Sequence, residues 1–167
     1  EIAVQRMEEP GADGADDVEF LISTNPGESL KPLGRIASGG ELSRVMLAIK
    51  TVLADQDAIE TVIFDEIDTG ISGRTAQKVS EKLALIGRSR QVICITHLAQ
   101  LASMADSHYC IEKRAVDGST QTGIRLLDEQ ESVEELARIL GGAQITDAVI
   151  DNAREMKKLA QKFKERR

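Results

Sequence analysis

Two short apolar segments that end in polar residues constrain the fold of this chain more than any other feature. Residues 61–66 (TVIFDE) and 91–96 (QVICIT) have the character of strands, and the helical pattern of residues 74–86 separates them. Strands that are apolar on both faces and joined through a helix are typical of a parallel sheet covered by helices. We therefore expect an α/β fold with a mostly parallel sheet flanked by helices.

The elements around this unit are expected to be further helices and two antiparallel hairpins. Residues 1–7 and 17–23 predict one hairpin with a long connection. A second hairpin is expected to turn at Asp117–Gly118, between residues 107–113 and 122–127. The strongest helix follows residue 38, and its apolar face should pack on the core. That face carries Leu42, Val45, Met46, Ile49, Val52 and Leu53. Weaker helical patterns cover residues 98–105, residues 132–140 and the stretch from about residue 146 into the basic tail.

The composition limits the possible classes of protein. The chain has 167 residues, a formal net charge of −7 and only 2% aromatic residues, so we expect one domain or one lobe with an aliphatic core. The acidic total argues against a surface that is basic throughout and coats nucleic acid. Cys94 and Cys110 lie in apolar runs and are expected to be buried, reduced thiols. The sequence has no bilayer-spanning run and no order typical of a signal peptide, which predicts a cytoplasmic protein.

Two carboxylates end the first apolar strand. Asp65 and Glu66 come directly after the apolar residues, and the glycines of DTGISG follow. Successive residues of a regular strand face opposite sides, so both carboxylates can serve one site only if the chain bends, and DTGISG is expected to supply the bend. A strand ending in Asp can hold Mg²⁺ for a nucleotide, and a second carboxylate can take a proton from water. The competing interpretation is a solvated strand end.

Two successive glycines precede the strongest helix. Ser38 and Glu41 have the spacing of a capping box, which explains these two residues by structure alone. It does not explain Gly39 and Gly40, because glycine adds a cost in backbone entropy. Glycines at a helix N-terminus let phosphate oxygens approach the backbone N–H groups, and this predicts an anion site. The sequence contains no Gly-Lys pair, so it lacks the P-loop that would hold most of a nucleotide's phosphates.

Three motifs, in this order, resemble those of a known family. ASGGELSR resembles the signature motif of ABC-type ATPases in the form used by SMC-like DNA-repair proteins, VIFDEID resembles their Walker B strand, and ITH resembles their switch histidine. The resemblance extends from about Val18 to the final helix. It implies that residues 1–167 are the C-terminal lobe of an ATPase head, an incomplete domain whose P-loop lobe and coiled coil lie elsewhere. It also implies ATP and Mg²⁺ as ligands, with ATP hydrolysed only by the completed head.

The resemblance implies that the signature motif acts across a dimer. The residues that would contact the γ-phosphate of ATP on a second head are Ser38, Gly39 and Gly40, and Glu41 is implied as a further nucleotide-binding residue. The implied partners are the P-loop lobe of the same protein, a second head in an ATP-dependent homodimer, and DNA, with no membrane. The implied setting is bacterial, cytoplasmic and associated with the nucleoid.

The resemblance places the chemistry at the two strand ends. Asp65 would hold Mg²⁺, Glu66 would deprotonate the attacking water, and His97 would hydrogen-bond the γ-phosphate. One position departs from many ABC proteins, because Ser72 stands where they carry an Asp in the loop that crosses the dimer. His97 also has a purely structural interpretation as an ordinary histidine at a strand end.

Two alternative functions stay open. A transporter ATPase subunit usually carries Pro or Ala after the Asp-Glu pair and Gln in the signature, where this chain has Ile67 and Glu41. A non-catalytic SMC-like dimerisation module would keep the fold without the chemistry, which the presence of Glu66 and His97 argues against. The basic end of the chain is either a solvated helix face or a contact to DNA phosphates. Its cations are Arg154, Lys157, Lys158, Lys162, Lys164, Arg166 and Arg167.

Overall fold

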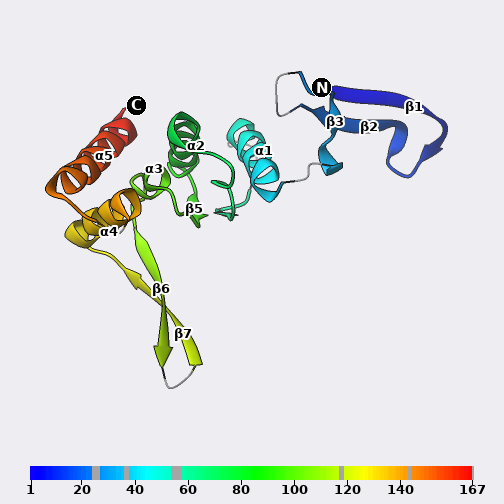
Figure 1. The fold of residues 1–167 in the computed structure, drawn as a ribbon. Coiled ribbons are helices and arrows are strands. Elements are labelled where there is room, and N and C mark those ends of the chain that lie inside the picture. The colour runs from blue at the N-terminus through cyan, green and yellow to red at the C-terminus, as the bar shows by residue number, and fades with distance from the viewer. Residues whose placement is uncertain (24–26, 36–37, 54–57, 117–118, 143, 167) are drawn as a thin grey trace.

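The computed structural model describes residues 1–23, 27–35, 38–53, 58–116, 119–142 and 144–166 (Figure 1). The strands are β1 (Ile2–Gly11), β2 (Gly14–Ile22), β3 (Lys31–Pro32), β4 (Thr61–Phe64), β5 (Gln91–Cys94), β6 (Tyr109–Val116) and β7 (Ser119–Leu126). The helices are the short η1 (Leu33–Arg35), α1 (Gly39–Val52), α2 (Gly73–Ile86), α3 (Ala99–Ala102), α4 (Glu129–Gly141) and α5 (Asp147–Glu165). None of the described helices is long and apolar enough to cross a membrane.

A parallel pair of strands lies at the centre of the fold, as the sequence predicts. In the β4–β5 pair, Val62 is opposite Val92 and Phe64 is opposite Cys94, and α2 makes the connection between the strands. The predicted apolar stripe of α2 packs against this pair. The core formed here consists of Leu47, Phe64, Ile67, Ala76, Val79, Leu83, Ile86 and Leu101. The predicted α/β class, with a parallel pair joined through a helix, is therefore confirmed.

The other face of the β4–β5 pair is uncovered within the described residues. Ile63 and Ile93, which are paired across the two strands, are 64% and 43% exposed. The apolar face predicted for α1 is also open: Val52 is 84% exposed, and only Gly40 and Leu47 of this helix are buried. The expectations that the sheet is covered on both sides and that this stripe joins the core are therefore wrong for this chain, because no described element packs there.

The first hairpin is longer and tighter than the sequence predicts. β1 and β2 continue to Gly11 and Gly14, so only two residues separate them and the long connection is wrong. Gly14 has φ 130°, a conformation that glycine adopts at little cost. A register shift between Arg6 and Gly11 absorbs the turn-forming residues as an irregularity within the strand.

Both hairpins present paired apolar side chains on one face. The pairs are Ile2–Phe20 and Val4–Val18 in the first hairpin, and Tyr109–Leu126 and Ile111–Ile124 in the second. Each of these residues is more than half exposed. The second hairpin projects away from the helices (Figure 1). Its strands pair as predicted but are longer at the turn, where β6 continues to Val116 and β7 begins at Ser119; the predicted turn, Asp117–Gly118, lies outside the described residues. Contiguous apolar faces of this kind usually mark contact surfaces.

A second core joins α3, α4 and α5. It consists of Ala99, Ala102, Val133, Leu136, Ala137 and Ala153. α4 begins earlier than predicted because Asp128 and Glu131 form a capping box: Asp128 Oδ1 accepts from the Glu131 N–H at 2.8 Å, and Glu131 Oε2 accepts from the Asp128 N–H at 2.9 Å. Gly142, at φ 60°, follows the end of the helix, as the glycine pair there predicts.

Candidate functional site

The chain reverses direction directly after β4, at Glu66. Glu66 has φ 56°, in the left-handed region that residues other than glycine rarely adopt. Asp65 Oδ1 accepts a hydrogen bond from the Glu66 N–H at 2.9 Å, and the Thr69 N–H donates to the Glu66 carbonyl oxygen at 3.0 Å. The bend therefore lies at Glu66 itself, before the DTGISG stretch in which the sequence predicts it. We call residues 65–69 the carboxylate turn.

The first turns of α1 hold the carboxylate turn in place. Ser43 Oγ donates to the Asp65 carbonyl oxygen at 2.9 Å. Arg44 Nη1 donates to the carbonyl oxygens of Ile67 at 3.1 Å and Thr69 at 2.8 Å. A left-handed glutamate costs about 1–3 kcal/mol and persists where its surroundings fix it, and these three hydrogen bonds provide that support. Ser43 and Arg44, the last two residues of the signature-like motif, are thus explained by their contacts within the chain.

Both glycines at the mouth of α1 pack closely on the carboxylate turn, Gly39 against the end of a flexible side chain and Gly40 against backbone oxygens. A Cβ at position 39 would lie 2.5 Å from Glu66 Oε2, and a Cβ at position 40 would lie 2.9 Å from the carbonyl oxygens of Glu66 and Thr69. Ser38 is the N-cap residue with extended backbone, but its side chain makes no cap hydrogen bond, so the capping box predicted with Glu41 is wrong. We call Ser38, Gly39 and Gly40 the helix mouth.

A buried carboxylate links the carboxylate turn to the end of β5. Asp68 is only 3% exposed, and its Oδ2 accepts hydrogen bonds from Thr96 Oγ1 at 2.6 Å and from the His97 N–H at 2.9 Å. His97 Nδ1 lies 3.1 Å from the same oxygen. The sequence reasoning missed Asp68. The available signal in the sequence was a third carboxylate close after the apolar strand, next to the apolar Ile67.

The structure therefore joins the helix mouth, Asp65, Glu66 and His97 into one connected cluster at the carboxyl ends of β4 and β5. This is the position at which ligands bind in open parallel sheets. Ser72 precedes α2 as its N-cap residue, is exposed and makes no side-chain cap hydrogen bond. The ligand contacts expected of the helix mouth, Glu41, Asp65, Glu66 and His97 stay predictions.

The donor set at Asp65 fits Mg²⁺ shared with a phosphate. Asp65 is exposed, and the Glu66 N–H fixes the orientation of its carboxylate. Among the described residues no group of three or more His, Cys, Asp or Glu side chains could hold a metal. Mg²⁺ commonly binds through one or two carboxylates, several waters and substrate phosphates, so a single oriented aspartate meets that requirement.

The pKa of the Cys94 thiol is affected by the carboxylates of this cluster. It is the last residue of β5 and is half-buried. Burial, with further contributions from the charges of Asp68 and Asp65, raises the pKa of the Cys94 thiol to about 12. Cys110 is also half-buried, and neither thiol forms a disulfide. Both cysteines are therefore free as predicted, although neither is fully buried.

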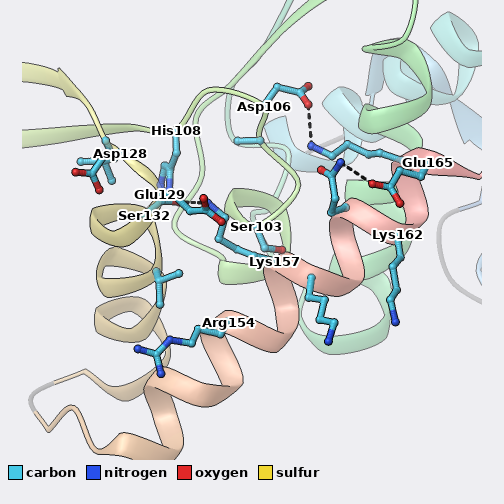
Figure 2. Close-up of a pocket in the computed structure, with 16 residues that line it drawn as sticks. Ser103, Asp106, His108, Asp128, Glu129, Ser132, Arg154, Lys157, Lys162 and Glu165 are labelled. Carbon is cyan, nitrogen blue, oxygen red and sulfur yellow. Dashed lines mark hydrogen bonds and ion pairs between the residues drawn. The ribbon is translucent and has the colours of Figure 1, made fainter.

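A groove lies away from this cluster, between α4 and α5 (Figure 2). It has a volume of about 710 Å³. At its inner end, Ser132 Oγ lies 2.8 Å from His108 Nδ1 and accepts a hydrogen bond from Lys157 Nζ at 3.0 Å. Burial lowers the pKa of His108; nearby Glu135 opposes this shift, and Lys157 adds to it.

Several cations of the basic C-terminal helix already have partners within the chain. Arg154 pairs with Asp151 at 2.9 Å, and Lys164 pairs with Asp106 at 2.7 Å. Carboxylates also line the groove beside these cations. The contacts favour the interpretation of α5 as a packed and solvated helix, and contact with DNA stays a prediction.

The α/β fold agrees with the layout expected of an SMC-like ATPase head. Comparison with curated proteins finds similarity to several that are named DNA repair protein RecN. The chain is 50% identical to RecN of Halalkalibacterium halodurans over 151 residues, which is 90% of this chain and 27% of that protein. It is 50% identical to RecN of Bacillus subtilis over 151 residues (90% and 26%) and 47% identical to RecN of Deinococcus radiodurans over 156 residues (93% and 27%). The resemblance inferred from the motifs is thus confirmed: in sequence, this chain is RecN-like over about nine-tenths of its length.

The chain spans only about a quarter of the length of these relatives. No protein-family profile matches it. A solved chain, from work on ATP-driven dimerization and DNA-stimulated activation of SMC ATPases, overlaps 83% of this chain and 81% of its own length, with 20% identity and a TM-score of 0.49. A structural similarity this low does not support any conclusion about function.

Proposed function

We propose that this chain is the signature-bearing part of an ATPase head in a RecN-like DNA repair protein. The observation that carries the proposal is the connected cluster of helix mouth, carboxylate turn and strand-end histidine. Phosphoryl-transfer sites need little covalent chemistry from the protein, but they need groups fixed around the phosphate and the attacking water. The hydrogen bonds of Ser43 and Arg44 to the carboxylate turn supply that rigidity.

Glu66 is the proposed general base. It would take a proton from water as the water oxygen forms a bond to the γ-phosphorus and the bond to the β–γ bridging oxygen breaks, leaving ADP and phosphate. The side chain of Glu66 is exposed, and its φ of 56° breaks the extended backbone of the strand at this residue. A positioned base of this kind typically contributes roughly 10²–10⁴-fold to a rate.

Asp65 and His97 would act on the phosphates. Asp65 is the residue that would hold Mg²⁺, which neutralises phosphate charge when it is bound. His97, with its side chain 74% exposed, would donate a hydrogen bond to the γ-phosphate. The helix mouth would offer its backbone N–H groups to the γ-phosphate of a nucleotide held by a second head.

A P-loop segment outside this chain is the proposed first partner. The sequence contains no Gly-Lys pair, and the open face of the β4–β5 pair leaves Ile63 and Ile93 exposed. The proposed P-loop lobe would cover that face and supply the missing phosphate contacts. A second head would complete the site in an ATP-dependent dimer, and DNA is the proposed substrate of the whole protein.

The relatives favour this function over the alternatives. A transporter ATPase subunit is disfavoured because the curated relatives at about 50% identity are DNA repair proteins. A non-catalytic dimerisation module is the competing outcome of the test. Intact Glu66 and His97 in one cluster support the catalytic version.

Reconstitution tests the proposal. This chain alone should not hydrolyse ATP, and mixing it with a separately produced P-loop lobe of the same protein should restore Mg²⁺-dependent hydrolysis. The same mixture made with the Glu66→Gln chain is the matched control. Hydrolysis by this chain alone would contradict the need for a separate P-loop lobe, and equal turnover with the Gln variant would contradict the role of Glu66 as base.

A further inference from the structure

We propose that Asp68 is a positioning residue that holds His97 in one tautomer and one direction. The proposal concerns the same site as the proposed function and rests on it for the identity of the phosphate that His97 would meet. The contact between the two side chains stands independently of that assignment.

A single oxygen of Asp68 collects three contacts. Oδ2 accepts from Thr96 Oγ1 at 2.6 Å and from the His97 N–H at 2.9 Å, and His97 Nδ1 lies 3.1 Å away. The Asp68 side chain is 4% exposed. A buried carboxylate is costly unless hydrogen bonds compensate its lost hydration, so these donors are needed to keep it in place.

The arrangement determines which nitrogen of His97 faces outward. A carboxylate oxygen only accepts, so a ring whose Nδ1 lies 3.1 Å from Asp68 Oδ2 favours the tautomer that carries its proton on Nδ1. Nε2 is then the nitrogen left for a ligand, on a ring whose side chain is 74% exposed. A carboxylate that orients a histidine through one ring nitrogen while the other nitrogen works is a recurring arrangement in enzyme sites.

Asp68 also ties His97 to the proposed base. It belongs to the same carboxylate turn as Glu66, and Arg44 holds that turn through the carbonyl oxygens of Ile67 and Thr69. Thr96 Oγ1, which donates to Asp68, in turn accepts from the Leu98 N–H at 3.0 Å. The geometry therefore fixes the ring relative to Glu66, and losing Asp68 should affect the rate of the chemical step more than the binding of nucleotide.

Nitrogen NMR of the imidazoles tests the contact without any activity measurement. The chain has two histidines, so a sample labelled with ¹⁵N-histidine gives two ring spin systems, which His108→Gln assigns. At about pH 8.5, where an ordinary histidine is neutral, His97 should carry its proton on Nδ1. Asp68→Ala should abolish this preference, and the near-isosteric Asp68→Asn should weaken it if the alanine variant fails to fold. Asp106→Asn, at an exposed carboxylate beside α5, is the control. A wild-type His97 protonated on Nε2 would overturn the proposal.

A double-mutant cycle in the full-length protein tests the role in the reaction. Asp68→Asn should lower kcat by about 100-fold, the scale of a misplaced catalytic group, with little change in KM. In a His97→Gln background the same change should add little, because its effect passes through His97. Additive losses would show a merely structural role and overturn the positioning assignment. If Glu66→Gln leaves turnover unchanged, the proposed function fails instead, and the NMR result still decides on Asp68.

Discussion

Gly39 and Glu66 are in such close contact that a Cβ on residue 39 would lie 2.5 Å from Glu66 Oε2. The two residues belong to different motifs and lie on opposite sides of β4 in the sequence. Their contact means that a side chain added at position 39 would displace the carboxylate of the proposed base. Any account of the glycines that considers only a bound phosphate is therefore incomplete.

The two glycines should respond differently to alanine. Gly39→Ala meets the end of a flexible side chain, so Glu66 should be displaced and hydrolysis by the full-length protein lost, with Tm nearly unchanged. Gly40→Ala meets two backbone oxygens at 2.9 Å and should destabilise the fold by about 1–3 kcal/mol. Thermal unfolding and ATP turnover measured on both variants separate the cases.

Gly34→Ala is the matched control, because nothing lies within 4 Å of a Cβ there. Its stability and turnover should equal those of the wild type. Equal destabilisation by Gly39→Ala and Gly40→Ala would contradict the packing described for the helix mouth.

Glu66→Gln should slow ATP hydrolysis by the full-length protein by roughly 10²–10⁴-fold, because glutamine cannot take the proton of the attacking water. Nucleotide should still bind, so ATP-bound dimers should accumulate. Single-turnover hydrolysis and size-exclusion chromatography with light scattering measure the two effects. Glu155→Gln, at an exposed glutamate of α5, is a suitable control, and unchanged turnover in the Glu66 variant would remove Glu66 from the role of base.

Ser38→Arg should abolish ATP-dependent dimerisation of the full-length protein. The arginine would fill the helix mouth, which in our proposal meets the γ-phosphate of the opposite head. Analytical ultracentrifugation with and without ATP measures the dimer. Binding of one nucleotide per monomer should persist, because the P-loop contacts are made elsewhere, and normal dimers would refute contact across the interface.

Stability should depend on pH through His108. Burial lowers the pKa of this histidine, while Glu135 opposes and Lys157 reinforces the shift. The unfolded chain therefore takes up a proton near pH 6.5, where His108 in the folded chain stays neutral. The free energy of unfolding should be highest above about pH 6.5 and should fall as the pH decreases below that value. His108→Gln should flatten this part of the profile in chemical unfolding followed between about pH 7.5 and 5.5.

The lowered pKa of Glu135, which faces His108, lies outside that pH range. Arg138, chiefly through its hydrogen bond, lowers the pKa of Glu135, so the stability contributed by this pair is lost only in more acidic solution. If the His108 variant keeps the wild-type slope between about pH 7.5 and 5.5, the burial of a neutral ring is not the cause.

The parts of the fold that were predictable depend on contacts within the chain. The alternation of strand, helix and strand determined the parallel pair, and the stripe of α2 packs as its spacing predicts, because both partners are present. The face of α1 could not be predicted from spacing alone: its apolar residues are real, but no described element covers Val52. Periodicity identifies an apolar face and does not identify what packs against it.

The site was predictable by residue and not by geometry. Asp65, Glu66 and His97 were visible as polar ends of apolar strands. The left-handed conformation of Glu66 was not, because it depends on distant support from Ser43 and Arg44. Asp68 was missed for a related reason, since its burial comes from folding the loop after β5 over it.

The hydrogen bonds from Ser43 and Arg44 connect the start of α1 directly to the segment that carries Glu66. In the proposed two-headed assembly this connected unit would border two nucleotides, one through Ser38 and the other through Glu66. Loss of the nucleotide from one site would then change the position of the groups at the other site. Coupled hydrolysis at the two sites would follow from the contacts within each subunit.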